Sequence, residues 1–465
     1  MLNYIWLALV VLAVVIGGLL GKLPEVAAKS FEMADVAVLK TAFSLIGVMA
    51  LWLGVMRLAE RAGLVALLAR MLKPVMRRIF PDVPPEHPAM GSMLMNIAAN
   101  MLGLGNAATP LGLRAMKDLE SLNRTPGSAT NAMCTFLAIN TSGIQLIPVT
   151  AIAIFSANKA SNPAAIVGTA IMATACAATG AVIMAKFLAR LPMFRLAEPQ
   201  SSFAPGSSRG NEAQTSPTKN QSLLTSAATE RKEDAAPVKE SATLQPLQWW
   251  GMIILAAYLL FFGWLFLRFA FPTWFNLPLS EEAAKQAVFV RIVSSVSLIS
   301  IPLLLSAIPL YAGLRRVKVY EEFVDGAKEG FDVAIRIIPY LVAMLVAIGM
   351  FRAAGGIDMV SKALAPAMNL VGFPTELLPM VLMRPLSGSG TLGMFTELVQ
   401  HFGADSLIAK MAGTIYGSTE TTFYVLAVYF GSVGVKRTRY AVAAGLTADA
   451  IGVIASIIIC RLVFG

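Results

Sequence analysis

The chain has 465 residues, of which 57% are hydrophobic and only 14% are charged. A soluble domain keeps about a quarter of its residues charged, so this composition excludes an ordinary soluble protein. The formal charge of +10 does not indicate nucleic-acid binding, because the basic residues lie between apolar segments, as they do on the cytoplasmic loops of membrane proteins.

Long apolar runs recur along the chain and approach the roughly 20 residues that a helix needs to cross a bilayer. The first run has no Lys or Arg before it and no cleavage site of small residues after it, so we expect a retained helix and not a signal peptide. The sequence therefore predicts an all-α protein that crosses the bacterial inner (cytoplasmic) membrane several times. The clearest apolar runs are residues 5–20, 45–56, 164–183, 251–267, 339–350 and 441–459.

A polar segment divides the chain near its middle. From about residue 198 to residue 245, Ser, Thr, Gln, Pro, Ala and charged residues dominate, and such a segment buries too little apolar surface to offset its ordering entropy. We therefore expect a first membrane repeat over residues 1–195, a flexible cytoplasmic linker over residues 196–246 and a second membrane repeat over residues 247–465.

The two membrane parts carry similar signals in the same order. Gly63 precedes Pro74 by the same interval that separates Gly355 from Pro366. A glycine-rich segment follows in each part, at residues 102–112 and 385–393, and then an apolar span that small polar residues interrupt, at residues 140–142 and 417–422. Broken helices occur in a bilayer only where they are buried or line a cavity. Each part is therefore expected to contain a broken, re-entrant helix.

The distribution of basic residues predicts that the second repeat is inverted relative to the first. In the first repeat they cluster over residues 57–78 and 114–124, whereas the clusters of the second lie at residues 315–318, before it, and 436–439, between its last two spans. Lys and Arg accumulate on the cytoplasmic side, so corresponding segments face opposite sides of the membrane. Inverted repeats with broken helices at matching positions are typical of secondary transporters.

Polar side chains gather at the interruptions, where half-helix ends would present free N–H and C=O groups to a solute. Each hydroxyl or amide could instead hold two helices together, but the set as a whole favours a polar cavity. Gln145 and Thr422 lie in the same segments. The candidate substrate-binding residues are Asn96, Asn100, Asn106, Thr109, Asn140, Thr141, Ser142, Arg384, Ser387, Ser389, Thr391, Ser418, Thr419, Glu420 and Thr421.

Arg384 and Glu420 are the two charged residues of this set. A charge near the membrane centre costs at least about 2.5–3.5 kcal/mol on insertion scales, so each needs a partner or a function. One hypothesis pairs the two as a structural bridge. In the other, Arg384 attracts an anionic or carbonyl-bearing solute, and Glu420 binds a coupling proton.

The sequence does not indicate an enzyme, a cofactor or a metal site. The glycine-rich residues 387–390 lack the following Lys-Ser/Thr and the preceding strand of a phosphate loop. The three cysteines and two histidines are scattered and give neither a disulfide framework nor metal-ligand spacing. No nucleophile and base stand out as a pair.

Longer motifs resemble a known family. Residues 100–110 (NMLGLGNAATP) and 133–148 resemble bacterial spore maturation protein A, and residues 326–330 (GAKEG), 384–390 (RPLSGSG), 416–424 (YGSTETTFY) and 431–434 resemble spore maturation protein B. The chain thus looks like a fusion of the two. The resemblance implies a place among the nucleoside-recognition, or gate, domains, which also occur in concentrative nucleoside transporters, and hence a transport-like membrane fold.

We therefore expect a secondary transporter of a small polar solute, either nucleoside-like or an organic anion, with proton coupling through Glu420. The alternative is a membrane scaffold or regulator of cell-envelope or spore maturation that moves no solute. The expected partners are the lipid bilayer and the small polar solute, and the sequence is compatible with a homo-oligomer.

Overall fold

The computed structural model describes residues 2–194, 246–275, 286–370 and 372–465. These ranges are almost entirely helical and contain no strand, which confirms the all-α prediction. The predicted linker lies outside the described residues, apart from residue 246.

The first half begins with a helical hairpin and continues through a long helix into a series of shorter ones. The hairpin consists of α1 (Leu2–Leu19) and α2 (Leu23–Asp35), and a π-helical segment, η1 (Val36–Ala42), joins α2 to α3 (Phe43–Arg61). Gly63 then takes a positive φ of 76°, which lets the chain turn sharply after α3. The remaining elements are α4 (Leu64–Ile79), α5 (Pro88–Met101), α6 (Gly105–Glu120), α7 (Asn131–Thr141), α8 (Val149–Ala157), α9 (Ile166–Arg190) and η2 (Pro192–Phe194).

The second half begins with a separate helical pair and then repeats the order of the first. The pair consists of α10 (Trp249–Ala270), followed by η3 (Pro272–Phe275), and α12 (Val288–Leu314). The series α13 to α19 then matches the series α3 to α9, element by element. Its members are α13 (Val319–Ala353), α14 (Gly356–Leu370), η4 (Thr375–Leu377), α15 (Leu378–Met383), α16 (Gly388–Phe402), α17 (Leu407–Ser418), α18 (Thr422–Ser432) and α19 (Ala441–Phe464).

Among the described residues, five helices are long and apolar enough to cross a membrane: α9, α10, α12, α13 and α19. The apolar run at residues 5–20 forms the shorter α1, and the run at residues 45–56 lies within α3. Most of α10 presents apolar side chains such as Ile253, Leu260 and Phe261 on the surface, as a helix in contact with lipid does. The chain is a membrane protein.

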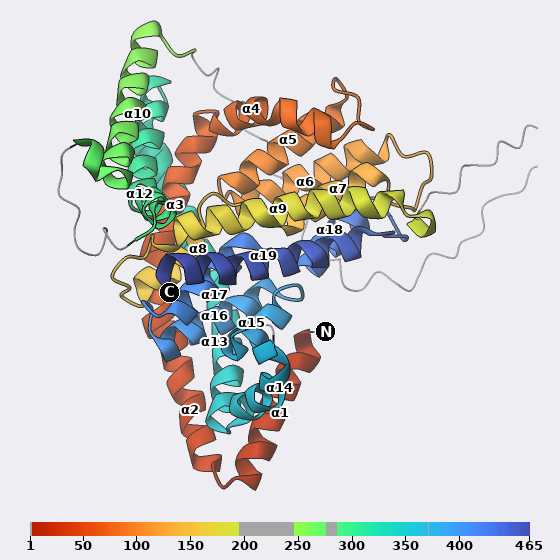
Figure 1. Ribbon diagram of the computed structural model, residues 1–465, viewed down its shortest axis with the longest axis vertical. Coiled ribbons are helices and arrows are strands. Elements are labelled where there is room, and N and C mark those ends of the chain that lie inside the picture. The colour runs from red at the N-terminus through yellow and green to blue at the C-terminus, as the bar shows by residue number, and fades with distance from the viewer. Residues whose placement is uncertain (1, 195–245, 276–285, 371) are drawn as a thin grey trace, which may run out of the picture.

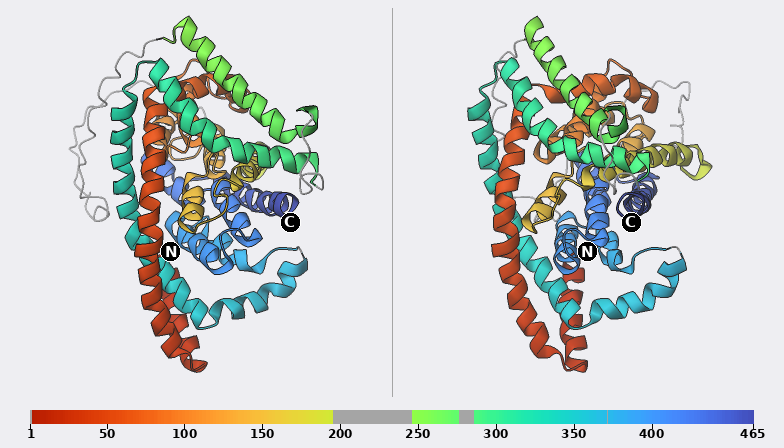
Figure 2. Two further views of the ribbon diagram at one scale, coloured as in Figure 1. Left: turned by 90° about the vertical axis from the view of Figure 1, so that its left-hand side faces the viewer. Right: turned by 60° about the vertical axis from the view of Figure 1, so that its left-hand side comes forward.

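The matching helices α3 and α13 pack side by side and run antiparallel (Figures 1 and 2). Gly54 of α3 lies against Phe323, near the start of α13, and Ala50 lies against Gly330, further along it. A Cβ atom on Gly330 would stand only 2.5 Å from the Cα atom of Ala50. Small residues four apart on both helices allow this close approach, as they do in other membrane helix pairs.

Several other contacts between the halves are reciprocal. Helix α8 packs on α16 and α17, and its counterpart α18 packs on α6 and α7. In the same way α7 packs on α19, and α17 packs on α9. The matching helices α9 and α19 lie side by side (Figure 1). The halves are therefore interlocked around shared helix pairs.

Candidate functional site

Helix breaks occur at all four predicted places. Residues 102–104 separate α5 from α6, and residues 384–387 separate α15 from α16. These glycine-rich breaks are shorter than predicted, because helix resumes at Gly105 and Gly388. Residues 142–148, here called the first polar break, separate α7 from α8, and residues 419–421, the second polar break, separate α17 from α18.

The two polar breaks touch each other. The backbone N–H of Glu420 donates to the carbonyl oxygen of Thr141, at 3.0 Å. Gly143 has a φ of +55°, and a Cβ atom on it would lie 2.8 Å from the carbonyl oxygen of Thr419. Glycine at this position therefore serves both the backbone conformation and the contact between the halves.

Arg384 is only 3% exposed and anchors the break before α16 to the end of α17. Its Nε donates to the Thr419 hydroxyl at 2.9 Å, and its Nη2 donates to the carbonyls of Tyr416, at 3.1 Å, and Thr419. The guanidinium also lies 4.7 Å from the centre of the Tyr416 ring. These carbonyls belong to the C-terminal end of a helix, where unpaired C=O groups carry partial negative charge.

Glu420 is held less tightly. Its Oε2 lies 3.9 Å from Nη2 of Arg384, the length of a loose ion pair, and its side chain is 36% exposed. Gln145, from the first polar break, donates to its Oε1 at 3.5 Å. The structural bridge between Arg384 and Glu420 is therefore weak in geometry, and the carboxylate keeps room for another partner.

Three of the candidate asparagines form a buried network. Asn100 donates to Asn140 at 2.9 Å and to Asn96 at 3.5 Å. Asn96 donates to the carbonyl of Ala108 at 2.8 Å and to the Tyr429 hydroxyl at 3.3 Å. These contacts join α5 and α7 of the first half to α18 of the second, so the network holds helices together.

The hydroxyl groups at the start of α16 form hydrogen bonds or close contacts within the same helix start. Ser387 accepts from the N–H of Gly390 at 3.0 Å and so caps the helix, and Thr391 donates to the Ser387 carbonyl at 2.6 Å. Ser389 lies 3.4 Å from Ser387 and is partly exposed. A Cβ atom on Gly388 would stand 3.1 Å from the Thr421 hydroxyl, so this helix start adjoins the second polar break.

The hydroxyls of the polar breaks mostly bond to the preceding helical turn, a common role for Ser and Thr. Thr141 donates to Ala138 at 2.9 Å and Ser142 to Ile139 at 2.7 Å. Ser418 pairs with Ser456 of α19 at 2.9 Å. The structure thus brings most of the candidates together but leaves Glu420 and Gln145 as the side chains most open to a solute.

Two candidates lie on α6, near Ala108, whose carbonyl accepts from Asn96. Thr109 is partly buried there. Asn106 lies within α6, but its side chain is outside what the structure describes.

Asp449 was missed by the sequence reasoning. It lies on α19, is 5% exposed, and its Oδ2 accepts from the Thr422 hydroxyl at 2.6 Å. The signal was available, because an acid inside an apolar span such as residues 441–459 marks a functional position by default.

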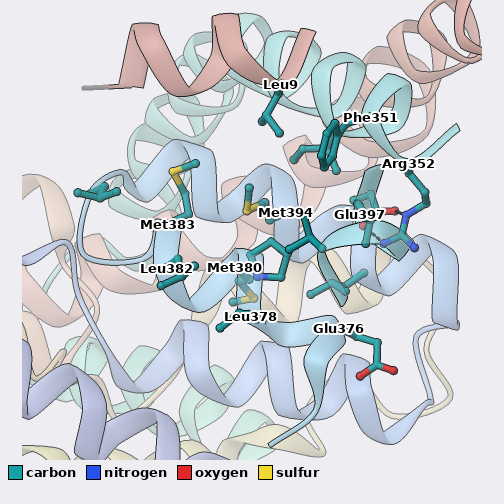
Figure 3. A pocket seen from close by; sticks show the side chains of 16 residues that line it. Leu9, Phe351, Arg352, Glu376, Leu378, Met380, Leu382, Met383, Met394 and Glu397 are labelled. Carbon is teal, nitrogen blue, oxygen red and sulfur yellow. Dashed lines mark hydrogen bonds and ion pairs between the residues drawn. The ribbon is translucent and has the colours of Figure 1, made fainter. Parts of the chain in front are cut away.

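A second buried ion pair lies elsewhere in the fold. Nη2 of Arg352, at the end of α13, donates to Oε2 of Glu397 on α16 at 2.9 Å, and the two side chains point toward each other in Figure 3. The pair borders an apolar cavity of about 280 Å³, lined in part by Met380 and Met394, and a polar cavity of about 590 Å³. The sequence reasoning did not select this pair.

Comparison with known proteins gives consistent results. The family described as nucleoside recognition (Gate) matches residues 42–190 and 334–436. Spore maturation protein B of Bacillus subtilis (strain 168) is 49% identical over 175 residues, which are 38% of this chain and 98% of that protein. Spore maturation protein A of the same strain is 44% identical over 187 residues, which are 40% of this chain and 95% of that protein.

A more distant relative is the inner membrane protein YjiG of Escherichia coli (strain K12), 32% identical over 84 residues, which are 18% of this chain and 55% of that protein. None of the relatives named here carries an enzyme name. No solved structure matches the chain.

Proposed function

The chain belongs to the nucleoside-recognition (Gate) family, as a fusion of one part homologous to spore maturation protein A and one homologous to protein B, and on that premise we propose that it moves a small polar solute across the bacterial inner membrane. One observation carries the proposal: a polar break from each half meets the other at a hydrogen bond between Glu420 and Thr141. Unwound backbone is tolerated at membrane depth where it is buried in protein or lines a cavity for a solute.

The packing supports an inverted repeat. Helices α3 and α13 hold equivalent places in the two series and pack antiparallel, as the contacts of Gly54 and Gly330 indicate. When two related units face each other across a two-fold axis, each contact from the first to the second is matched by an equivalent contact from the second to the first. If α3 and α13 cross the bilayer, the axis that relates them lies in the membrane plane, which is the geometry of inverted repeats. The broken helices are then re-entrant.

The junction of the polar breaks is the proposed binding site. Glu420 and Gln145 present a carboxylate and an amide from opposite halves, 3.5 Å apart. Arg384 already donates to Thr419 and Tyr416, so it is poorly placed to take an anion as well. We therefore favour a neutral solute with hydroxyl and amide groups, nucleoside-like in chemistry, over an organic anion. The remaining candidates position the breaks.

Proton coupling through Glu420 is part of the proposal. Its carboxylate is in contact with groups of both halves and is partly exposed, so a proton could reach it when one side opens. Protonation would remove the ion pair with Arg384 and change the contact with Gln145. A rearrangement of one half against the other would then follow from a local change of charge.

The alternative is a membrane scaffold or regulator of envelope or spore maturation without solute flux. The names of the two most extensive relatives, spore maturation proteins A and B, favour it. The solute and a second copy of the chain remain predictions as partners.

A thermal-shift experiment separates the two functions. Purified protein in detergent is heated with and without nucleosides, nucleoside monophosphates and other polar metabolites. A solute that binds only the folded state, at a concentration 100 times its Kd, stabilises the folded protein by about 2.7 kcal/mol. We expect a neutral, nucleoside-like compound to raise the melting temperature of the wild type and not that of Gln145→Ala. No response to any compound, together with stable co-purification of envelope proteins, would favour the scaffold.

A further inference from the structure

One face of α19 supports both polar breaks. Gly445 lies against residues that flank both breaks, since a Cβ atom on it would stand 2.9 Å from Cγ2 of Thr422 and 3.3 Å from the hydroxyl of Thr141, the residue before the first break. Gly452 lies against the second, since a Cβ atom there would stand 3.2 Å from the carbonyl oxygen of Ser418. Asp449 lies between these two glycines on the same face of the helix, because residues three and four apart are neighbours on a helix surface.

The carboxyl group of Asp449 is buried and only half paired. Its Oδ2 accepts from the Thr422 hydroxyl at 2.6 Å, whereas its Oδ1, also buried, has no hydrogen-bond partner in the described part of the chain. Thr422 is the first residue of α18, so this contact ties Asp449 directly to the second polar break.

The charged groups that act on Asp449 are Arg384, from the break before α16, and Glu420, from the second polar break. The other helices that pack on this face of α19 contribute neutral residues, such as Thr141 of α7, Ala177 of α9 and Ser418 of α17. Near the junction there are thus two carboxyl groups and one cation. No ion pair joins Arg384 to Asp449 in the described part of the chain, because the guanidinium donates to Thr419 and Tyr416.

We propose that Asp449 is a proton-binding site built into the support of the two polar breaks. An unpaired ionised carboxylate is costly to bury, whereas a neutral acid needs only one acceptor. The Thr422 hydroxyl donates to Oδ2 at 2.6 Å, and its oxygen accepts from the protonated acid when the hydroxyl rotates and the hydrogen bond reverses. A metal cation would need a shell of several oxygen ligands, and the pairing seen here involves a single hydroxyl. The proton sits on Oδ2 or is shared with Thr422.

Ionisation requires water, because a buried charge is stabilised when hydration reaches it. Water reaches Asp449 when α19 separates from one of the breaks, and the proton then leaves to that side while Arg384 offers a countercharge. This coupling role rests on the proposed transport function. The proton site itself does not, since it follows from burial and pairing alone.

Infrared difference spectroscopy tests the site directly. The full-length protein in liposomes is stepped between acidic and alkaline pH, and the carbonyl stretch of protonated carboxylic acids is recorded. We expect a titrating band in the wild type that is absent from Asp449→Asn and is kept in Glu420→Gln. It is also kept in Glu397→Gln, the control, which removes another buried carboxyl group, the one that pairs with Arg352.

The proposal is overturned if the band survives in Asp449→Asn or disappears in Glu420→Gln. It is also overturned if replacing potassium by sodium at constant pH removes the band, because that outcome identifies a metal cation. Should Asp449→Asn fail to fold, Asp449→Glu must shift the band, and an unshifted band rejects the site. A band that titrates at Asp449 in protein without solute flux leaves the proton site standing and removes only its coupling role.

Discussion

The backbone N–H of Glu420 lies 3.0 Å from the carbonyl oxygen of Thr141, so the second half of the chain supplies a hydrogen-bond partner for a helix end of the first. Glu420 follows the end of α17, and Thr141 is the last residue of α7, its counterpart. Unwound ends of this kind need partners in a membrane. This hydrogen bond therefore needs both halves of the chain.

Gly143→Ala is expected to destabilise this junction. The new Cβ atom would meet the Thr419 carbonyl oxygen at 2.8 Å and would also occupy a residue with positive φ, so we expect a loss of about 1–3 kcal/mol in the free energy of unfolding. Gly127→Ala is the matched control, because Gly127 has a φ of +81° but nothing within 4 Å of its added Cβ atom. Equal losses of thermal stability in the two variants would mean that the break-to-break contact is not tight.

The α3–α13 pair gives a second prediction. Gly330→Ala places a methyl group 2.5 Å from the Cα atom of Ala50, so the helices must separate, and we expect a lower melting temperature. Gly47→Ala, on α3 itself, meets nothing within 4 Å and should be neutral or raise stability by up to about 1 kcal/mol through helix propensity. Unfolding in a detergent series measures both. An unchanged Gly330→Ala protein would argue against this helix contact.

A lysine cannot take over the role of Arg384, so we expect the Arg384→Lys variant to be less stable than the wild type. A lysine ammonium is a compact point charge and cannot reproduce the planar fork that reaches Thr419 and Tyr416 together. Each buried carbonyl left unpaired costs about 1–3 kcal/mol, so the variant should lose stability by at least that amount. Lys362→Arg, at an exposed position on α14, serves as the control for changing one cation into another. Thermal unfolding of both variants provides the measurement.

Asp405, in the loop between α16 and α17, is expected to make the thermal stability of the protein depend on pH. Asp405 accepts from the hydroxyl of Ser161 at 2.7 Å and from its N–H at 3.1 Å, and these hydrogen bonds lower the pKa of the Asp405 carboxyl group. A carboxyl with a lower pKa in the folded state stabilises the protein above its unfolded pKa and loses that contribution as the pH falls through the folded pKa. The melting temperatures of wild type and Asp405→Asn should therefore differ at neutral pH and converge in acid.

Asp358→Asn controls for the loss of an exposed carboxylate in that experiment. A wild-type advantage over Asp405→Asn that grows as the pH falls would contradict the assigned direction.

The sequence predicted the helical class, the membrane character, the matching order of signals and the positions of the breaks, because apolar runs, glycine and proline act locally. It did not predict that the polar breaks touch, since the contact of Glu420 with Thr141 joins residues distant in sequence. It offered Glu420 as the partner of Arg384, whereas the shorter contacts of Arg384 go to Thr419 and Tyr416. Backbone carbonyls carry no signature in a sequence.

The candidate site shows the same limit. Asn96 and Asn100 were chosen as solute ligands, but their side chains bond to other groups of the protein and join helices of both halves. Residue type alone cannot separate these roles, because an amide in a membrane helix serves either. Asp449 could have been found, since its charge within an apolar span is a local signal.

The central claim is that the junction of the polar breaks moves a solute, and flux through proteoliposomes tests it most directly. A mixed pool of labelled polar metabolites, nucleosides included, is followed in uptake and efflux, with and without a pH gradient. The proteins compared are the wild type, Glu420→Gln and the control Glu397→Gln, whose carboxyl group pairs with Arg352. We expect pH-driven flux of a neutral solute in the wild type and the control, and its loss in Glu420→Gln. Flux that is equal in Glu420→Gln, or absent from the wild type for every solute in both directions, would contradict the account.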